Sequence, residues 1–133
     1  TEKEAKFRLV EYQIVQSHFD IKIQNEEEYS NLAIEVERQN GINEERRLFR
    51  LDLLVRIKDD NDKINISVEI LGLFEFDSDI NTQLRDNFFM INAPAILFPH
   101  VRAYVSALTA LSGFKPIILP TINFAVAKLD KTE

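Results

Sequence analysis

Two alternating stretches joined by a polar turn constrain the fold of this chain more than any other feature. Between Phe49 and Ile57 the odd positions are apolar and most even ones polar, and a second alternation runs from Ile64 to Phe76. Between them lie the turn formers Asp59 to Asp62. Successive side chains of a strand point to opposite faces of a sheet, so a period of two indicates a strand with one buried face. The two stretches predict a long β-hairpin.

Shorter alternations before the hairpin predict two more strands. Their apolar rows are Phe19, Ile21 and Ile23, then Leu32, Ile34 and Val36. Val10, Tyr12 and Ile14 stand in the opposite phase to Phe19, so we expect a β-bulge or break near residues 15–17. Gly41, in Gln39-Asn40-Gly41, indicates a turn. Residues from about 7 to 76 are therefore predicted to form four antiparallel strands with one polar face.

The last third of the chain has a helical period. Apolar residues recur three or four positions apart, at Leu97, Val101, Tyr104, Leu108 and Leu111. This spacing predicts a helix over about 95–112, with Pro99 in its first turn and Gly113 as a left-handed cap. Interspersed small residues would allow another helix to approach closely: Ala103, Ala107 and Ala110. A short terminal helix is predicted over about 122–130. Strands followed by helices favour an α+β domain with the helices covering one sheet face.

Composition narrows the classes of function. The 133 residues suit a single domain spanning 1–133, and 45% hydrophobic with 29% charged residues is typical of globular proteins. A net charge of −6 opposes binding to nucleic acid or to an anionic membrane surface. There is no cysteine, so disulfides and thiolate metal sites are excluded. No apolar run approaches the roughly 20 residues that span a bilayer. The first residues lack the apolar core of a signal peptide, so we expect a cytoplasmic protein.

Residues suited to catalysis or metal binding are sparse. His18 and His100 are the only histidines, and neither has a companion at ligand spacing, which favours surface or structural roles. Asp59 to Asp62 resembles the start of a calcium loop but lacks the later glycine and glutamate. The glutamates at 26–28 and 44–45 are expected to be solvated, with docking of a basic partner as the alternative. No P-loop, G-x-S-x-G or H-E-x-x-H motif is present, so we predict no catalysis, no metal and no cofactor.

Two motifs in the last third resemble those of the SecB family. Residues Pro94 to Arg102 resemble the signature Pro-x-Ile-Leu-Phe-Pro-(aromatic)-x-Arg that opens the long helix of that family. Residues Leu119 to Phe124 resemble its Leu-x-Pro-x-Asn-Phe, and the separation of the two motifs fits without a gap. Two motifs at matched spacing are far more specific than either alone. A weaker likeness, in the same order along the chain, precedes residue 93.

The resemblance implies a fold, an assembly and an activity. SecB proteins have a four-stranded antiparallel sheet with one long and one short C-terminal helix packed on one face, and they assemble as a homotetramer, a dimer of dimers. They hold secretory precursors unfolded for the SecA translocation ATPase, without nucleotide or metal. The chain is therefore expected to be a chaperone of unfolded polypeptides in the Sec export pathway.

The same resemblance points to individual residues. Family clients lie along the second strand and near the last helix, which gives as client-binding residues Leu32, Ile34, Val36, Ile117, Leu119 and Phe124. An apolar groove beside a sheet can accept both side chains and backbone of an extended segment. All six would equally suit the core of any α+β protein, so both interpretations stay open. The resemblance gives Asp20 and Glu69 as residues for SecA-like docking, whereas a third acidic position of the family is Gln24 here.

Two alternatives remain for the function. The segment from Leu108 to Phe114 looks more like divergent SecB-like proteins, some of which protect the antitoxin of a toxin–antitoxin system. A non-chaperone scaffold that reuses the fold is the other alternative, because a fold does not determine a function.

Overall fold

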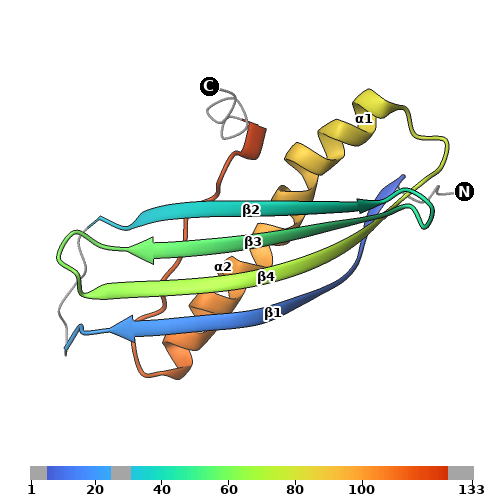
Figure 1. Ribbon diagram of the computed structural model, residues 1–133. Coiled ribbons are helices and arrows are strands. Elements are labelled where there is room, and N and C mark those ends of the chain that lie inside the picture. Colours follow the sequence, from blue (N-terminus) through green and yellow to red (C-terminus); the bar gives the residue numbers. More distant parts are fainter. Residues whose placement is uncertain (1–5, 25–30, 126–133) are drawn as a thin grey trace, which may run out of the picture.

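The computed structural model describes residues 6–24 and 31–125. Four strands form one antiparallel sheet in the order β1-β4-β3-β2, with β1 spanning Phe7–Ile21, β2 Ala33–Asn43, β3 Leu48–Lys58 and β4 Ile64–Phe76. The helical elements all lie behind one face of this sheet (Figure 1). The predicted α+β class, with an open antiparallel sheet covered on one face, is confirmed.

The central hairpin of β3 and β4 has the predicted alternation. Its inward-facing side chains, such as Leu51 and Ile66, are fully buried, and its outward-facing ones are partly exposed. Asp59 closes the turn, because its Oδ1 accepts hydrogen bonds from the backbone N–H groups of Lys63 at 2.8 Å and Ile64 at 3.0 Å. This first carboxylate of the acidic cluster is thus used within a hairpin turn.

The predicted bulge in β1 is confirmed. The β1–β4 register shifts between Leu9 and Glu11 and again between Ile14 and Gln16. An extra residue in one strand reverses the phase of the side chains that follow. The second shift lies between Tyr12 and Phe19, so both side chains reach the same inner face of the sheet although their positions differ by an odd number, seven.

The turn predicted at Gly41 is wrong. Gly41 lies inside β2 and pairs with Arg50, and the turn comes later, at residues 44–47. Asn43 starts this turn by accepting a hydrogen bond from the Arg46 N–H at 3.1 Å, and Arg47 takes a left-handed φ of 54°. Side-chain capping by asparagine and a left-handed arginine thus supply the reversal that the glycine was expected to provide.

Helical turns that the sequence did not predict precede the predicted helix. Helical backbone starts with α1 (Thr82–Asn87), continues as the π-helix η1 (Phe88–Asn92) and runs on as α2 (Ala93–Leu111). The side chain of Asn81 caps the start by accepting from the Leu84 N–H at 2.8 Å. The helix predicted over about 95–112 corresponds to α2, whereas the helical turns of residues 82–92 were not predicted. Gly113, with a φ of +93°, ends the helix as predicted.

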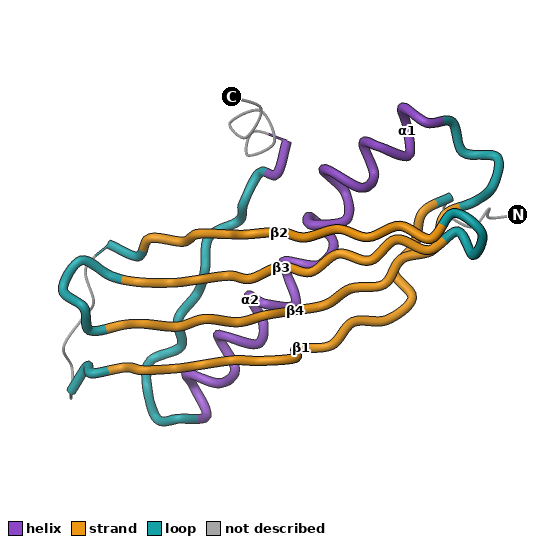
Figure 2. The backbone as a smooth tube through the Cα atoms, in the orientation of Figure 1, coloured by secondary structure: helices purple, strands orange, loops and turns teal. Residues whose placement is uncertain are grey.

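The helix packs closely on the middle of the sheet. A Cβ added to Gly72 in β4 would come within 2.8 Å of Leu97 Cδ1, so the lack of a side chain at Gly72 leaves room for Leu97 of α2. After α2 the chain turns back and crosses behind the strands from the β1 side to beyond β2 (Figure 2). Of the terminal helix predicted over 122–130, residues 124 and 125 are helical, and 126–130 lie outside the described residues.

Candidate functional site

An apolar row on β2 lies at the edge of the sheet, on the face that carries the helices. Leu32, Ile34 and Val36, here called the β2 row, are half-buried and pack against the core. The neighbours of the last two in β3, Ile57 and Val55, are completely buried. Since β2 is the last strand of the described sheet, the row keeps one side toward solvent. It therefore offers apolar surface that a further apolar segment can cover.

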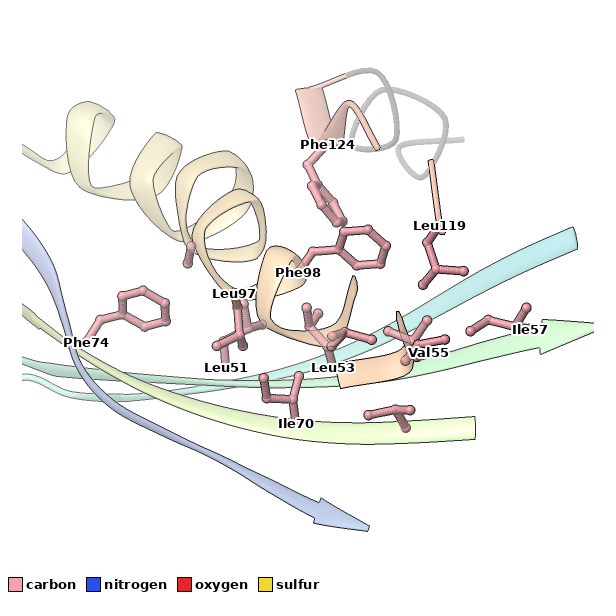
Figure 3. Close-up of a cluster of buried hydrophobic side chains, with 14 of the residues drawn as sticks. Leu51, Leu53, Val55, Ile57, Ile70, Phe74, Leu97, Phe98, Leu119 and Phe124 are labelled. Atoms are coloured by element: carbon pink, nitrogen blue, oxygen red, sulfur yellow. The ribbon is translucent and has the colours of Figure 1, made fainter. Parts of the chain in front are cut away.

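The other three predicted client-binding residues belong to the core. Ile117 and Leu119 are 2% and 1% exposed, and Phe124 packs edge-on against Phe98 with ring centroids 5.9 Å apart. Figure 3 shows Leu119 and Phe124 gathered with Phe98 above the buried side chains of β3. Their neighbour Ile118 points outward and is 62% exposed. The apolar surface that this segment presents is thus carried by Ile118 instead.

Two polar side chains of α2 hold the crossing segment in place. Thr109 Oγ1 accepts a hydrogen bond from the Ile117 N–H at 3.0 Å and donates to the Val105 carbonyl at 2.8 Å. Arg102 Nε donates to the Leu119 carbonyl at 2.8 Å. Buried backbone groups outside regular structure need such partners. The last residue of the first motif therefore fixes the first residue of the second, a relation that sequence reasoning did not reach.

Arg38 continues the β2 row at one end and ties β2 to the helix. Its guanidinium donates through Nη1 to the Met90 carbonyl at 3.0 Å and through Nη2 to the Phe89 carbonyl at 2.7 Å. In an α-helix the N–H of position 94 would donate to the Met90 carbonyl, and in a π-helix it would donate to the Phe89 carbonyl. Pro94 has no N–H and can do neither. Partial burial lowers the pKa of Arg38 from its usual value. Sequence reasoning missed this residue, and the signal was an arginine at a position that continues an apolar row.

The predicted docking residues lie on the opposite, helix-free face. Asp20 pairs across strands with Asn65, and Glu69 pairs with Gln16 and Leu54, so both point away from the helices. They are four residues apart along the sheet, about 13 Å at the rise of a strand. Glu69 borders a hollow of about 550 Å³ that is also lined by Val36, Glu37, Arg38, Gln39, Asp52, Leu53 and Leu54. Gln24 follows β1 and is exposed.

The structure also shows the surroundings of the two histidines and of the acidic side chains. Within residues 6–24 and 31–125, no group of three or more His, Asp or Glu side chains is arranged to hold a metal ion. His100 stacks on Tyr12 with ring centroids 4.0 Å apart, and His18 is exposed on the helix-free face. No helix of the described part is both long and apolar enough to cross a membrane.

An exposed apolar surface runs along α2 and the neighbouring edge of β1. Val10, Tyr12 and Val15 of β1 are about half exposed, and Leu111 at the end of α2 is 82% exposed. Three of the small residues of α2 are exposed as well: Ala103, Ala107 and Ala110. The part of this surface that belongs to α2 is here called the alanine face, and it consists of those three alanines and Leu111. The small side chains of α2 thus point away from the sheet, as close approach by another helix would require.

Comparisons with known proteins agree with this geometry. The family model described as preprotein translocase subunit SecB matches residues 14–129. The Protein-export protein SecB of Anaplasma phagocytophilum is 29% identical over 101 residues, which are 72% of this chain and 64% of that protein. The same-named protein of Saccharophagus degradans is 34% identical over 76 residues, 56% of this chain and 45% of the relative.

A relative without an assigned activity is also similar. An uncharacterized protein of Methanocaldococcus jannaschii is 45% identical over 62 residues, 47% of this chain and 39% of that protein. The chain thus spans less than two thirds of the length of these relatives.

A solved structure matches the fold. The Mycobacterium tuberculosis SecB-like chaperone, in complex with a ChAD peptide from the HigA1 antitoxin, superposes with a TM-score of 0.69 at 13% identity and covers 88% of each chain. A family model that covers most of the chain, together with the two motifs and the shared fold, leads to one conclusion: this chain belongs to the SecB family.

Proposed function

We propose that this protein is a chaperone subunit that holds unfolded polypeptides and catalyses no reaction. The observation that carries the proposal is the β2 row, which stays only partly buried beside the fully buried side chains of β3. An unfolded client exposes apolar side chains, and covering apolar surface stabilises the complex by roughly 25 cal/mol per Å² before the costs of binding. Binding of this kind is reversible and needs no cofactor.

The β2 row defines where a client lies. Ile34 and Val36 of the edge strand β2, and Leu32 just before it, are two residues apart in the sequence. This is the spacing of alternate side chains of an extended peptide. Ile118 of the crossing segment offers a further exposed apolar side chain. Ile117, Leu119 and Phe124 act beneath it, because as core residues they support the surface and contact a client only if the segment moves.

Suppression of aggregation tests this proposal. An unfolded model protein is diluted from denaturant and its light scattering is followed with and without a stoichiometric amount of the chaperone. The double variant Ile34→Asp/Val36→Asp should suppress aggregation at least several-fold less well than the unmodified protein. The control is Glu35→Gln, one residue away on the opposite face, and it should behave like the unmodified protein. Failure of the unmodified protein to suppress aggregation would sink the proposal.

The assembly proposed is a homotetramer, a dimer of dimers, in which the alanine face of α2 contacts another copy. Exposed small residues allow helices to pack closely, and Leu111 would lose most of its 82% exposure there. Light scattering after size-exclusion chromatography should give the mass of four chains. Ala107→Glu should reduce this mass, whereas a stable monomer of the unmodified protein would contradict the assembly.

For the pathway, we propose export through the Sec system. The relatives named protein-export proteins support it, and Asp20 and Glu69 share a face that no described helix covers. In the proposed complex, SecA docks on this face. Chaperone with bound precursor should stimulate the ATPase activity of SecA, and Asp20→Lys/Glu69→Lys should abolish the stimulation while aggregation suppression persists.

The second candidate is protection of an antitoxin. The observation favouring it is the fold shared with a SecB-like chaperone bound to an antitoxin peptide. In that case the protein should fail to stimulate SecA, and it should protect from proteolysis an antitoxin encoded beside its own gene. A scaffold without chaperone activity would do neither and would not suppress aggregation.

A further inference from the structure

Two arginines of this sheet stand in the same local arrangement but have different partners. On β3, Arg50 directs Nε and Nη2 at the two carboxylate oxygens of Asp52, at 2.9 and 3.1 Å. On β2, Arg38 directs the same two nitrogens at the single amide oxygen of Asn40, at 3.4 and 3.3 Å. In both cases the partner lies two residues on and therefore on the same face of the strand. The hydrogen bonds on β2 are the longer ones, and their acceptor is neutral.

The edge of a guanidinium that carries Nε and Nη2 is shaped for a carboxylate. Its two parallel N–H groups match the two oxygens of a carboxylate, and such charge-assisted pairs are shorter and stronger than neutral ones. The Asn40 side chain fills this edge with one oxygen at the long end of the hydrogen-bond range and is itself exposed. It can therefore leave at little cost.

No carboxylate of the described residues compensates the charge of Arg38. Its other contacts are the carbonyls of Phe89 and Met90, which are neutral. The Arg38 side chain is partly buried on the helix-covered side of β2, where an ionic attraction is weakened by water less than at a fully exposed site. A cation with only neutral partners in such a place gains from a bound anion.

We propose that Arg38 recognises a carboxylate of the bound polypeptide, which displaces the Asn40 amide and pairs with Nε and Nη2. The inference rests on the proposed function, because Arg38 lies on the same face as Ile34 and Val36. Two residues, about 7 Å, separate Arg38 from the end of the β2 row. The preferred client segment is therefore a short apolar stretch that carries an aspartate or glutamate about two residues beyond one of its ends.

Binding of designed peptides tests this preference. Fluorescent peptides with both ends blocked carry a stretch of alternating valine and serine, followed two residues later by Asp in one peptide and by Asn in its match. Fluorescence anisotropy with the unmodified protein should show about 10-fold tighter binding of the Asp peptide, as expected for one charge-assisted pair. Asn40→Asp fills the guanidinium edge from within the chain, as Asp52 does for Arg50, and should reduce the preference to less than 2-fold.

A matched control separates this effect from general charge repulsion. Gln39→Glu adds the same charge one residue away on the opposite face of β2, and it should keep the 10-fold preference. A third peptide with Asn in place of Asp and a free C-terminal carboxylate at the same position distinguishes a chain terminus from a side chain as the source of the anion.

The outcomes are separable. Equal binding of the Asp and Asn peptides by the unmodified protein would overturn the role of Arg38 and leave the holding function intact. Loss of the preference in Gln39→Glu as well as in Asn40→Asp would also overturn it, because overall charge would then explain the result. Absence of binding of either peptide, together with failure to suppress aggregation, would instead remove the proposed function itself.

Discussion

The two edges of this sheet are built differently. β1 has two register shifts, and its inner side chains contact α2 through the Tyr12–His100 stack and the hydrogen bond between Ser17 and Tyr104, 2.8 Å long. β2 pairs with β3 without any shift, and Arg38 connects it to the helix by two charge-assisted hydrogen bonds. Bulges and covering elements protect an edge strand from pairing with other chains. The regular β2 edge, with its partly buried apolar row, lacks such bulges and is the edge that we propose for binding.

The largest effect on stability is expected when the hydrogen bonds between β2 and the helix are removed. Arg38→Met keeps an unbranched apolar side chain but leaves the Phe89 and Met90 carbonyls without their donor, so the free energy of unfolding should fall by about 2 to 3 kcal/mol. Urea unfolding measures this loss. Hydrogen exchange should become faster in β2 and in η1 and stay unchanged at Tyr12. Uniform acceleration across both edges would contradict a local connection.

Arg56→Met is the matched control for this change. Arg56 pairs with Glu37 on the exposed face, and exposed ion pairs contribute about 0 to 1 kcal/mol. A loss as large as that of Arg38→Met would mean that any arginine near β2 has the same effect.

A smaller effect is expected from crowding the middle of the sheet on the β1 side. Gly72→Ala places a Cβ against Leu97, so the neighbouring side chain must shift, and the unfolding free energy should fall by about 1 to 2 kcal/mol. Gly41→Ala on β2 meets no atom within 4 Å and should be neutral or raise stability by about 0.5 kcal/mol. Equal costs at the two glycines would show that the helix is not held at its observed distance.

The third test fills the guanidinium edge of Arg38. Asn40→Asp should raise the unfolding free energy by about 1 kcal/mol, because it gives the partly buried Arg38 a carboxylate partner as Asp52 does for Arg50. The gain should disappear in 1 M salt, where such interactions are screened. A loss of stability would contradict the similarity of the two arginine sites.

The smallest effect concerns the β1 edge. Tyr104→Phe removes the hydroxyl that contacts Ser17 but keeps the ring beside Phe19. Because this hydrogen bond is exposed to water, thermal unfolding should show a loss of about 0.5 kcal/mol or less. A larger loss would mean that the cover of β1 depends on this bond more than on packing.

The sequence allowed much of this fold to be predicted, for physical reasons that can be named. Alternation is strong where one face is fully buried, so the hairpin of β3 and β4 was recognisable, and a reversal of phase located the bulge of β1. The helical turns of α1 and η1 were missed because α1 buries no residue and η1 is a continuous apolar run, Phe88 to Ile91, from which no helical period can be read. Gly41 misled because a glycine in an edge strand looks like one in a turn.

The candidate site was predictable only in part. The β2 row could be found from its alternation, but the burial of Ile117 and Leu119 depends on hydrogen bonds from Thr109 and Arg102. Such bonds join residues that are distant in the sequence, and apolar character alone does not distinguish a core position from a binding surface. Arg38 could not be assigned because its partners are backbone carbonyls, which every residue possesses.

The π-helix next to Pro94 has a consequence for how positions 38 and 94 vary among relatives. Proline at position 94 removes an N–H group, and Arg38 supplies the donors in its place, so the two positions form one chemical unit. A relative with another residue at position 94 would have its own N–H there, and its position 38 would be free to vary. Aligned relatives should therefore show the two positions changing together, and a Pro94→Ala background should make the loss of Arg38 less costly.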